Sequence, residues 1–105
     1  MKLLNIDYVP GKEIEPLGIV KGTVVHTKNV GRDFMAAMKT LVGGELVGYT
    51  QMLNEARQIA SKRMVDEAEA LGADAIINVR YGTSSVMSGA AEVIAYGTAV
   101  KFVAK

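Results

Sequence analysis

The sequence predicts a single α+β domain spanning residues 1–105, in which a mostly antiparallel sheet carries helices on one face in two layers. Three observations predict this fold class. One long segment repeats apolar residues at the three- and four-residue spacing of an amphipathic helix, and several other segments alternate as strands do. The length of 105 residues suits one domain that buries its own core. The expected order of elements is β-α-α-β-β.

Two strands are expected before the first helix. Residues 2–8 form a short one, and Pro10-Gly11 and Pro16 mark the turns that follow it. Residues 17–30 then alternate apolar and small side chains, and neither set of alternate positions is clearly hydrophilic. Because both faces of this strand lack a polar pattern, we expect both to be covered.

A short helix is expected over residues 32–42. Phe34, Met38 and Leu41 are spaced four and three apart, and Gly43-Gly44 follows as a helix stop. Most of the circumference of this helix is apolar, which indicates that it is covered from two directions.

A long helix is expected to begin at Leu46 or Tyr49 and to end at Leu71. Its apolar residues repeat at three and four, and charged residues occupy the outer side. Arg63 and Glu67 are spaced to form an i,i+4 pair on that side. Gly72 ends the helix just before an apolar strand begins.

The last two strands are expected at residues 74–83 and 92–103, joined as a hairpin through residues 84–89. The final strand is apolar or small on both sides. Leaving about 400 Å² of one sheet face wet would forgo up to about 10 kcal/mol at about 25 cal/mol per Å². We therefore expect a closed homo-oligomer, with Ala95 and Ala99 in contacts between copies.

Composition excludes several functional classes. The net charge of +1 arises from twelve basic and eleven acidic residues, and Lys62-Arg63 is the only adjacent basic pair. A basic stripe for nucleic acid or an anionic membrane is therefore missing. The chain has no cysteine, and residues 1–6 lack the apolar core of a signal peptide. We expect a cytoplasmic protein without a cofactor.

Three local features give only weak indications of a phosphate-binding, catalytic or metal-binding site. Residues 43–50 have the glycine spacing of a phosphate-binding loop, but Tyr49 stands where that loop needs lysine. His26, the one histidine, lies in an apolar strand, which favours a structural role over a catalytic or metal-binding one. Met35 and Met38 offer thioethers, although methionine at helical spacing is more often core filler.

Six short motifs follow one another along the chain, namely Arg32-Asp33-Phe34, Gly43-Gly44, Gly48-Tyr49, Glu55-Ala56-Arg57, Leu71-Gly72-Ala73-Asp74-Ala75 and Gly97-Thr98-Ala99-Val100. In this order and spacing they resemble the YbjQ family. The resemblance extends from about Leu17 to Val100 and implies a bacterial or archaeal cytoplasmic protein with a dodecin-like β-α-β-β subunit. It also implies assembly as a pentamer, with stacked pentamers as a further expectation. The family is described as putatively heavy-metal-binding and has no established activity.

The sequence leaves three functional classes open. The first is a homo-oligomeric binding or scaffolding module for a small ligand, with its site at the subunit interface or the ring axis. The second is a metal-binding protein that uses carboxylates, with His26 or methionines as helpers. The third is an interface acid-base enzyme, for which no nucleophile or base stands out. No catalytic residue is assigned, and the candidate binding residues are Arg32, Asp33, Tyr49, Glu55, Arg57 and Asp74.

Overall fold

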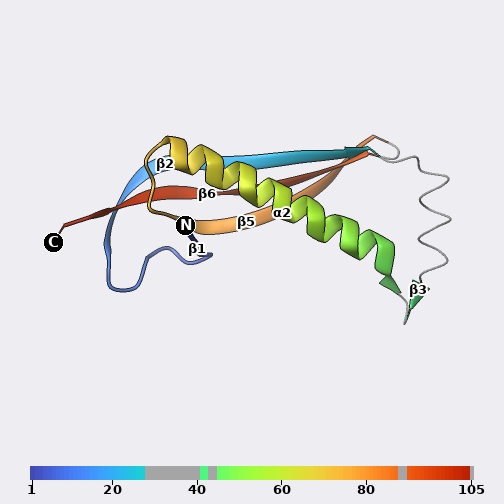
Figure 1. Cartoon of the computed structure of the whole chain (residues 1–105), viewed down its shortest axis with the longest axis horizontal. Helices are drawn as coiled ribbons and strands as arrows, with labels where there is room; N and C mark the ends of the chain where they lie inside the picture. Colours follow the sequence, from blue (N-terminus) through green and yellow to red (C-terminus); the bar gives the residue numbers. More distant parts are fainter. Residues whose placement is uncertain (28–40, 43–44, 88–89, 105) are drawn as a thin grey trace.

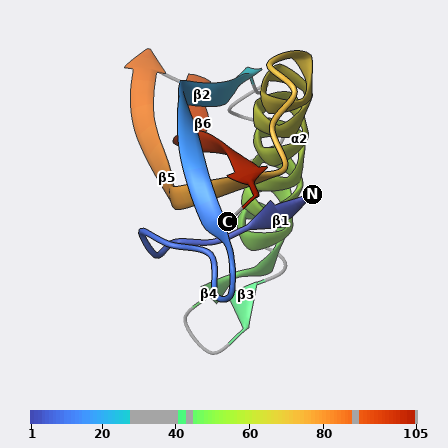
Figure 2. The same ribbon diagram turned by 90° about the vertical axis from the view of Figure 1, so that its left-hand side faces the viewer.

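The computed structural model describes residues 1–27, 41–42, 45–87 and 90–104, and in them one long helix packs on a four-stranded sheet (Figures 1 and 2). The strand order is β1-β5-β6-β2, and β3 and β4 form a separate two-stranded sheet. The α+β class is confirmed. The elements are β1 (Lys2–Leu3), β2 (Glu13–Thr27), β3 (Leu41–Val42), β4 (Glu45–Leu46), α2 (Val47–Ala70), β5 (Ala75–Met87) and β6 (Ala90–Val103).

The main sheet is mostly antiparallel, as predicted. β6 lies at its centre and pairs antiparallel with β2 and with β5, whereas β1 joins β5 in parallel. The register shifts between Ile77 and Arg80, and Asn78 within this bulge has a φ of 53°. Asparagine is among the few residues other than glycine that adopt this left-handed conformation readily. The bulge brings Val79 to the face beneath α2 and Arg80 to the opposite face.

Helix α2 contains 24 residues, and it extends about 35 Å at about 1.5 Å per residue. Its end is closed as the sequence predicts. Gly72 has a φ of 78°, and the backbone amide of Ala73 donates to the carbonyl of Ala68 at 3.1 Å. No helix in the described part of the chain is both long enough and apolar enough to cross a membrane.

The main core lies between α2 and the sheet. Small side chains on α2 allow the helix to approach β2 closely, and the approach is closest at Gly22. A Cβ atom on Gly22 would lie 2.5 Å from the backbone nitrogen of Met64 and would overlap the carbonyl oxygen of Ala60. The buried residues of this core are Val20, Val24, Ala56, Ala60, Met64, Ala68, Ile76, Val79, Val93, Ala95 and Ala99.

A second, smaller core lies on the opposite face at one end of the sheet. The chain before β2 folds over this end and buries Val9 against residues of β5 and β6. It also covers part of the outer edge of β5, since the amides of Asn78 and Val79 donate to the carbonyls of Ile6 and Leu4, each at 2.9 Å. The buried members of this core are Val9, Ala75, Ile77 and Val100.

Two sequence-based predictions are wrong. Leu41 and Val42, expected to end a short helix, form β3 and pair with β4; the rest of that predicted helix, residues 32–40, lies outside the described residues. Ala95 and Ala99, expected between copies, are fully buried beneath α2. The alternation of a strand with small residues on both sides does not reveal which side the helix covers.

Beyond the second core, the described residues leave much of the sheet face that points away from α2 uncovered. The register aligns Lys21, Tyr96 and Arg80 in one row across β2, β6 and β5 on this face. Three apolar side chains on it are markedly exposed, namely Ile19 (79%), Val25 (54%) and Tyr96 (39%). We call these residues, with the half-buried Ile94, the open-face patch.

Candidate functional site

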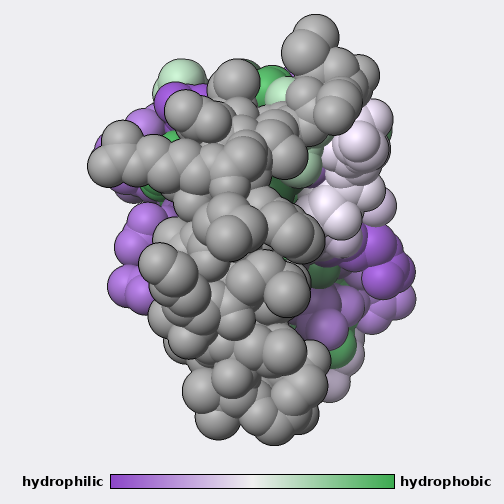
Figure 3. All heavy atoms as spheres, turned by 90° about the vertical axis from the view of Figure 1, so that its right-hand side faces the viewer, coloured by the Kyte–Doolittle hydropathy of each residue, from purple (hydrophilic) through white to green (hydrophobic). Residues whose placement is uncertain are grey.

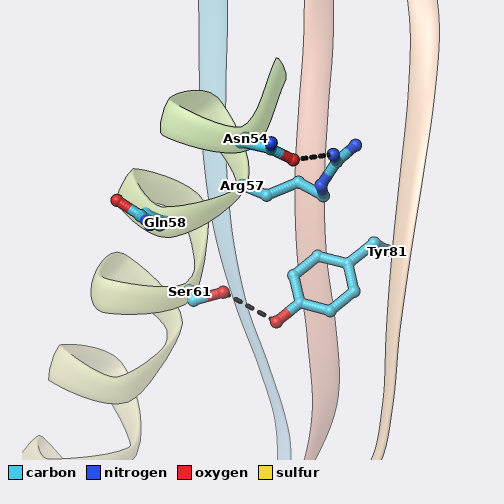
Figure 4. A pocket seen from close by; sticks show the side chains of 5 residues that line it. All are labelled: Asn54, Arg57, Gln58, Ser61 and Tyr81. Carbon is cyan, nitrogen blue, oxygen red and sulfur yellow. Dashed lines mark hydrogen bonds between the residues drawn. The ribbon is translucent and has the colours of Figure 1, made fainter. Parts of the chain in front are cut away.

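A hollow of about 530 Å³ lies between α2 and β5 (Figure 4). Four of its residues are on α2 with the spacing i, i+3, i+4 and i+7, so that they share one side of the helix. The fifth comes from β5, whose Tyr81 pairs with Ala95 on the strand face beneath α2. The lining residues are Asn54, Arg57, Gln58, Ser61 and Tyr81, and together they are called the α2/β5 hollow.

Two hydrogen bonds organise the α2/β5 hollow. The hydroxyl oxygens of Ser61 and Tyr81 lie 2.8 Å apart, which joins the helix to the strand. Arg57 donates from its guanidinium group to the side-chain oxygen of Asn54. Figure 4 shows the guanidinium group and the Tyr81 ring on the same side of α2, whereas the Gln58 amide points away from them.

The lining of this hollow is suited to holding a ligand by hydrogen bonds. Arg57 is half-buried and carries the only formal charge among the five residues. Its five described residues include no histidine, cysteine or carboxylate, the side chains that most often act as a general base.

The structure brings one predicted site residue, Arg57, into the hollow. Glu55 lies two positions earlier on α2, is exposed and does not line it. Asp74 lies at the start of β5, where its carboxylate accepts a hydrogen bond of 2.8 Å from the backbone amide of Phe102. This bond ties the end of β6 to the turn after α2.

The other predicted residues lie wholly or partly outside the described part of the chain. Tyr49 lies in the first turn of α2, and His26 lies on β2 opposite Ala91, but their side chains are outside the described part. Arg32 and Asp33 are outside it altogether. Whether these residues form a site with Glu55 or Asp74 stays a prediction.

Sequence reasoning missed four of the five lining residues. Three of them, Asn54, Gln58 and Ser61, have a detectable signal, because their spacing with Arg57 places uncharged polar residues beside the apolar stripe of α2. Tyr81 has no such signal, since it is brought to the helix only by the pairing of β5 with β6.

A second hollow, of about 510 Å³, lies on the open face of the sheet. It combines apolar and polar groups at the bulge of β5. Its lining residues are Asp7, Ile19, Asn78, Arg80, Tyr96, Gly97 and Thr98. This hollow therefore overlaps the open-face patch and belongs to the same surface.

Figure 3 views the molecule from the end near β3. The described residues that are visible there are mostly hydrophilic, with a few small hydrophobic areas (Figure 3). Exposed apolar side chains lie on both faces of the sheet, since Ile19, Val25 and Tyr96 are on the open face and Tyr81, 46% exposed, is on the face beneath α2.

Comparison with known proteins identifies the family. The model of the YbjQ family, described as "putative heavy-metal-binding", matches residues 1–103. The chain belongs to the YbjQ family. Relatives described as UPF0145 proteins include one from Clostridium novyi, 62% identical over 96% of this chain and 98% of its own length. Another, from Alkaliphilus metalliredigens, is 60% identical over 98% of this chain and its full length.

A solved structure supports the fold of this YbjQ family member. The crystal structure of a protein of unknown function in the DUF74 family, from Pediococcus pentosaceus, matches with a TM-score of 0.65. The match covers 98% of both chains at 19% sequence identity. At this identity the likeness concerns the fold alone.

The donor atoms of this YbjQ protein do not fit the metal chemistry in the family description. Soft heavy-metal ions prefer thiolate ligands, and the chain has no cysteine and one histidine. Among the described residues, no group of three or more His, Cys, Asp or Glu side chains lies close enough to hold a metal ion.

Proposed function

We propose that this protein is a homo-oligomeric binding or scaffolding module of the cytoplasm, in which the open sheet face of each copy is covered by a neighbouring copy. The observation that carries the proposal is the open-face patch. In it, the side chain of Ile19 is 79% exposed although Ile19 lies within strand β2. Contiguous exposed apolar surface is typical of sites where another protein surface binds.

The energetic gain from covering this patch supports the proposal. Complete burial of a Val, Ile or aromatic side chain stabilises by about 1.5–3 kcal/mol. Scaled by their exposed fractions, Ile19, Val25 and Tyr96 together would contribute about 4 kcal/mol per copy. That is a large share of the about 5–15 kcal/mol by which a domain is stable, so a free monomer would forgo much of its available stability.

A second copy is the occupant that the charge of the chain favours. The net charge of +1 gives little repulsion between identical chains. The open face carries Lys21, Arg80 and Glu92 around its apolar residues, so that charges of both signs are available for pairing between copies. Resemblance to the YbjQ family adds the finer proposal of five copies in a dodecin-like ring, which can stack on a second ring.

The binding role rests on the α2/β5 hollow. Its side chains lie on the helix-covered side of the sheet, whereas the proposed interface lies on the other side. Assembly through the open face would therefore leave Arg57 and Tyr81 accessible to a ligand. In this arrangement the open face of each copy contacts a neighbouring copy, and the α2/β5 hollow binds the ligand.

The alternative function is metal binding, which the family description favours. In this chain it would depend on carboxylates, with His26 or methionines as helpers, and it predicts weak affinity for soft ions because thiolates are missing.

The proposal is tested by two matched substitutions read by native mass spectrometry and circular dichroism. Ile19→Glu places a charge in the open-face patch, and Ile59→Glu places the same charge on α2, where Ile59 is 41% exposed. Ile19→Glu should reduce the mass to that of smaller species while helix content is kept, and Ile59→Glu should stay assembled. The reverse result would place the interface on the helix and contradict the proposal.

A further inference from the structure

We infer that the α2/β5 hollow binds a small oxyanion, a carboxylate or phosphate group, through Arg57, Asn54 and the Ser61–Tyr81 hydroxyl pair. The inference rests on the proposed function only in taking this hollow as the binding site. It is independent of assembly, because all of the lining residues belong to one copy.

The first support is the small number of hydrogen-bond partners that the Arg57 guanidinium group has. Among the described residues, this group makes one hydrogen bond, to the neutral side chain of Asn54. The ion pair found in that part of the chain joins Lys62 to Asp66, and none of the five described lining residues is a carboxylate. A half-buried arginine is thus left with most of its five N–H donors unused, in a planar arrangement that matches the two oxygens of a carboxylate or phosphate.

The second support is the surplus of donors around Arg57. The side-chain oxygen of Asn54 is already occupied by Arg57, so that the Asn54 amide offers its N–H groups to a ligand. Ser61 and Tyr81 share one hydrogen between them, which leaves the other hydroxyl hydrogen free to donate. Three sets of donors therefore line the same hollow, beside the positive charge of Arg57, which favours a ligand that brings negatively charged oxygen atoms.

The size and form of the hollow limit the ligand. Its volume of about 530 Å³ is within the usual range for small-molecule sites. One of its five described residues is positively charged, so a group with one or two negative charges is matched better than a polyanion. The same positive charge of Arg57 disfavours a metal cation in this hollow.

The experiment is a titration of the assembled protein with inorganic phosphate and, separately, with acetate, each at constant ionic strength maintained with chloride. Intrinsic tyrosine fluorescence is the readout, since the chain has no tryptophan and four tyrosines and one of them lines the hollow. Native mass spectrometry of the same samples reports the state of assembly separately.

We expect a saturable fluorescence change with phosphate, acetate or both in the millimolar range or below, and the stronger of the two identifies the source of the oxyanion. Arg57→Ala should weaken binding by about tenfold or more. Arg57→Lys keeps the charge but loses the planar pair of donors. Its affinity for the anion should therefore lie between that of Arg57→Ala and that of the wild type. Lys62→Ala removes the same charge from an exposed position outside the hollow and should leave affinity unchanged.

Three results would overturn the inference: no saturation by either anion, an equal response to chloride alone, or equal affinity in Arg57→Ala and wild type. An assembled protein that fails to bind overturns the oxyanion inference alone. A monomeric protein that binds contradicts the proposed assembly and leaves the oxyanion site standing.

Discussion

The hydroxyl groups of Ser61 on α2 and Tyr81 on β5 are hydrogen bonded, with 2.8 Å between their oxygen atoms. This bond connects the helix to a strand that it otherwise contacts less than β2 and β6. It therefore both closes one side of the α2/β5 hollow and determines where the phenol of Tyr81 lies (Figure 4).

A double-mutant cycle measures this connection. Ser61→Ala and Tyr81→Phe should each lower the free energy of unfolding by about 1 kcal/mol, because each removes the same hydrogen bond. The double variant should lose little more than either single one, as urea denaturation would show. Losses that simply add would mean that the two hydroxyl groups do not interact in solution.

Substitution at Gly22 tests the close packing of α2 on β2. In Gly22→Ala the new methyl group would overlap the carbonyl of Ala60 and lie 2.8 Å from Cβ of Arg63. We expect destabilisation of about 3 kcal/mol or more, measured by thermal unfolding. Gly82→Ala is the matched control, because its methyl group would meet Ile94 at 3.4 Å, and it should change stability by about 1 kcal/mol or less.

The outer edge of β2 is occupied by side chains of α2. Arg63 donates to the carbonyl of Thr23 at 2.6 Å, and the backbone amide of Lys21 donates to Glu67 at 3.4 Å. The sequence suggested that Arg63 and Glu67 pair with each other, but each is hydrogen bonded to the strand instead. Such capping of an edge strand hinders unwanted pairing between chains.

Arg63→Ala tests the role of this edge. The variant should lose about 1 kcal/mol of stability, because an exposed hydrogen bond from a charged donor is removed, and its turbidity on heating should rise. Lys62→Ala, which breaks the exposed pair with Asp66, should cost about 0.5 kcal/mol or less. Identical behaviour of the two variants would show that capping of Thr23 has no effect.

Much of the fold could be predicted from the sequence because its signals are local. The spacing of Ala56, Ala60 and Met64 and the glycine at 72 determine the helix and its end, and both are confirmed. What alternation could not show is which face of β6 the helix covers. The sheet buries Ala95 and exposes Tyr96, and that choice depends on contacts between segments distant in sequence.

The site was harder to predict than the fold. The motif Glu55-Ala56-Arg57 indicates Arg57 as a candidate, but it does not predict which residues lie near Arg57 in the folded chain. Asn54 and Ser61 stand at helical spacing from Arg57. This signal is easy to overlook because both residues are uncharged and polar. Tyr81 reaches them through strand register alone, and no local pattern in the chain encodes that contact.

Metal affinity distinguishes the alternative function. Since soft ions prefer thiolates and this chain has none, calorimetry with Zn²⁺, Cu²⁺ and Hg²⁺ should reveal no sub-micromolar site in protein purified without a histidine tag. A tight stoichiometric site that His26→Ala abolishes would establish the metal-binding alternative instead.

The central claim is that the open sheet face of each copy is covered by a neighbouring copy, and the most direct test is the mass of the native protein at micromolar concentration. Sedimentation or native mass spectrometry should give an assembly well above the 11.2 kDa of one chain, with five copies as the expected number. A stable, well-folded monomer at that concentration would contradict the account.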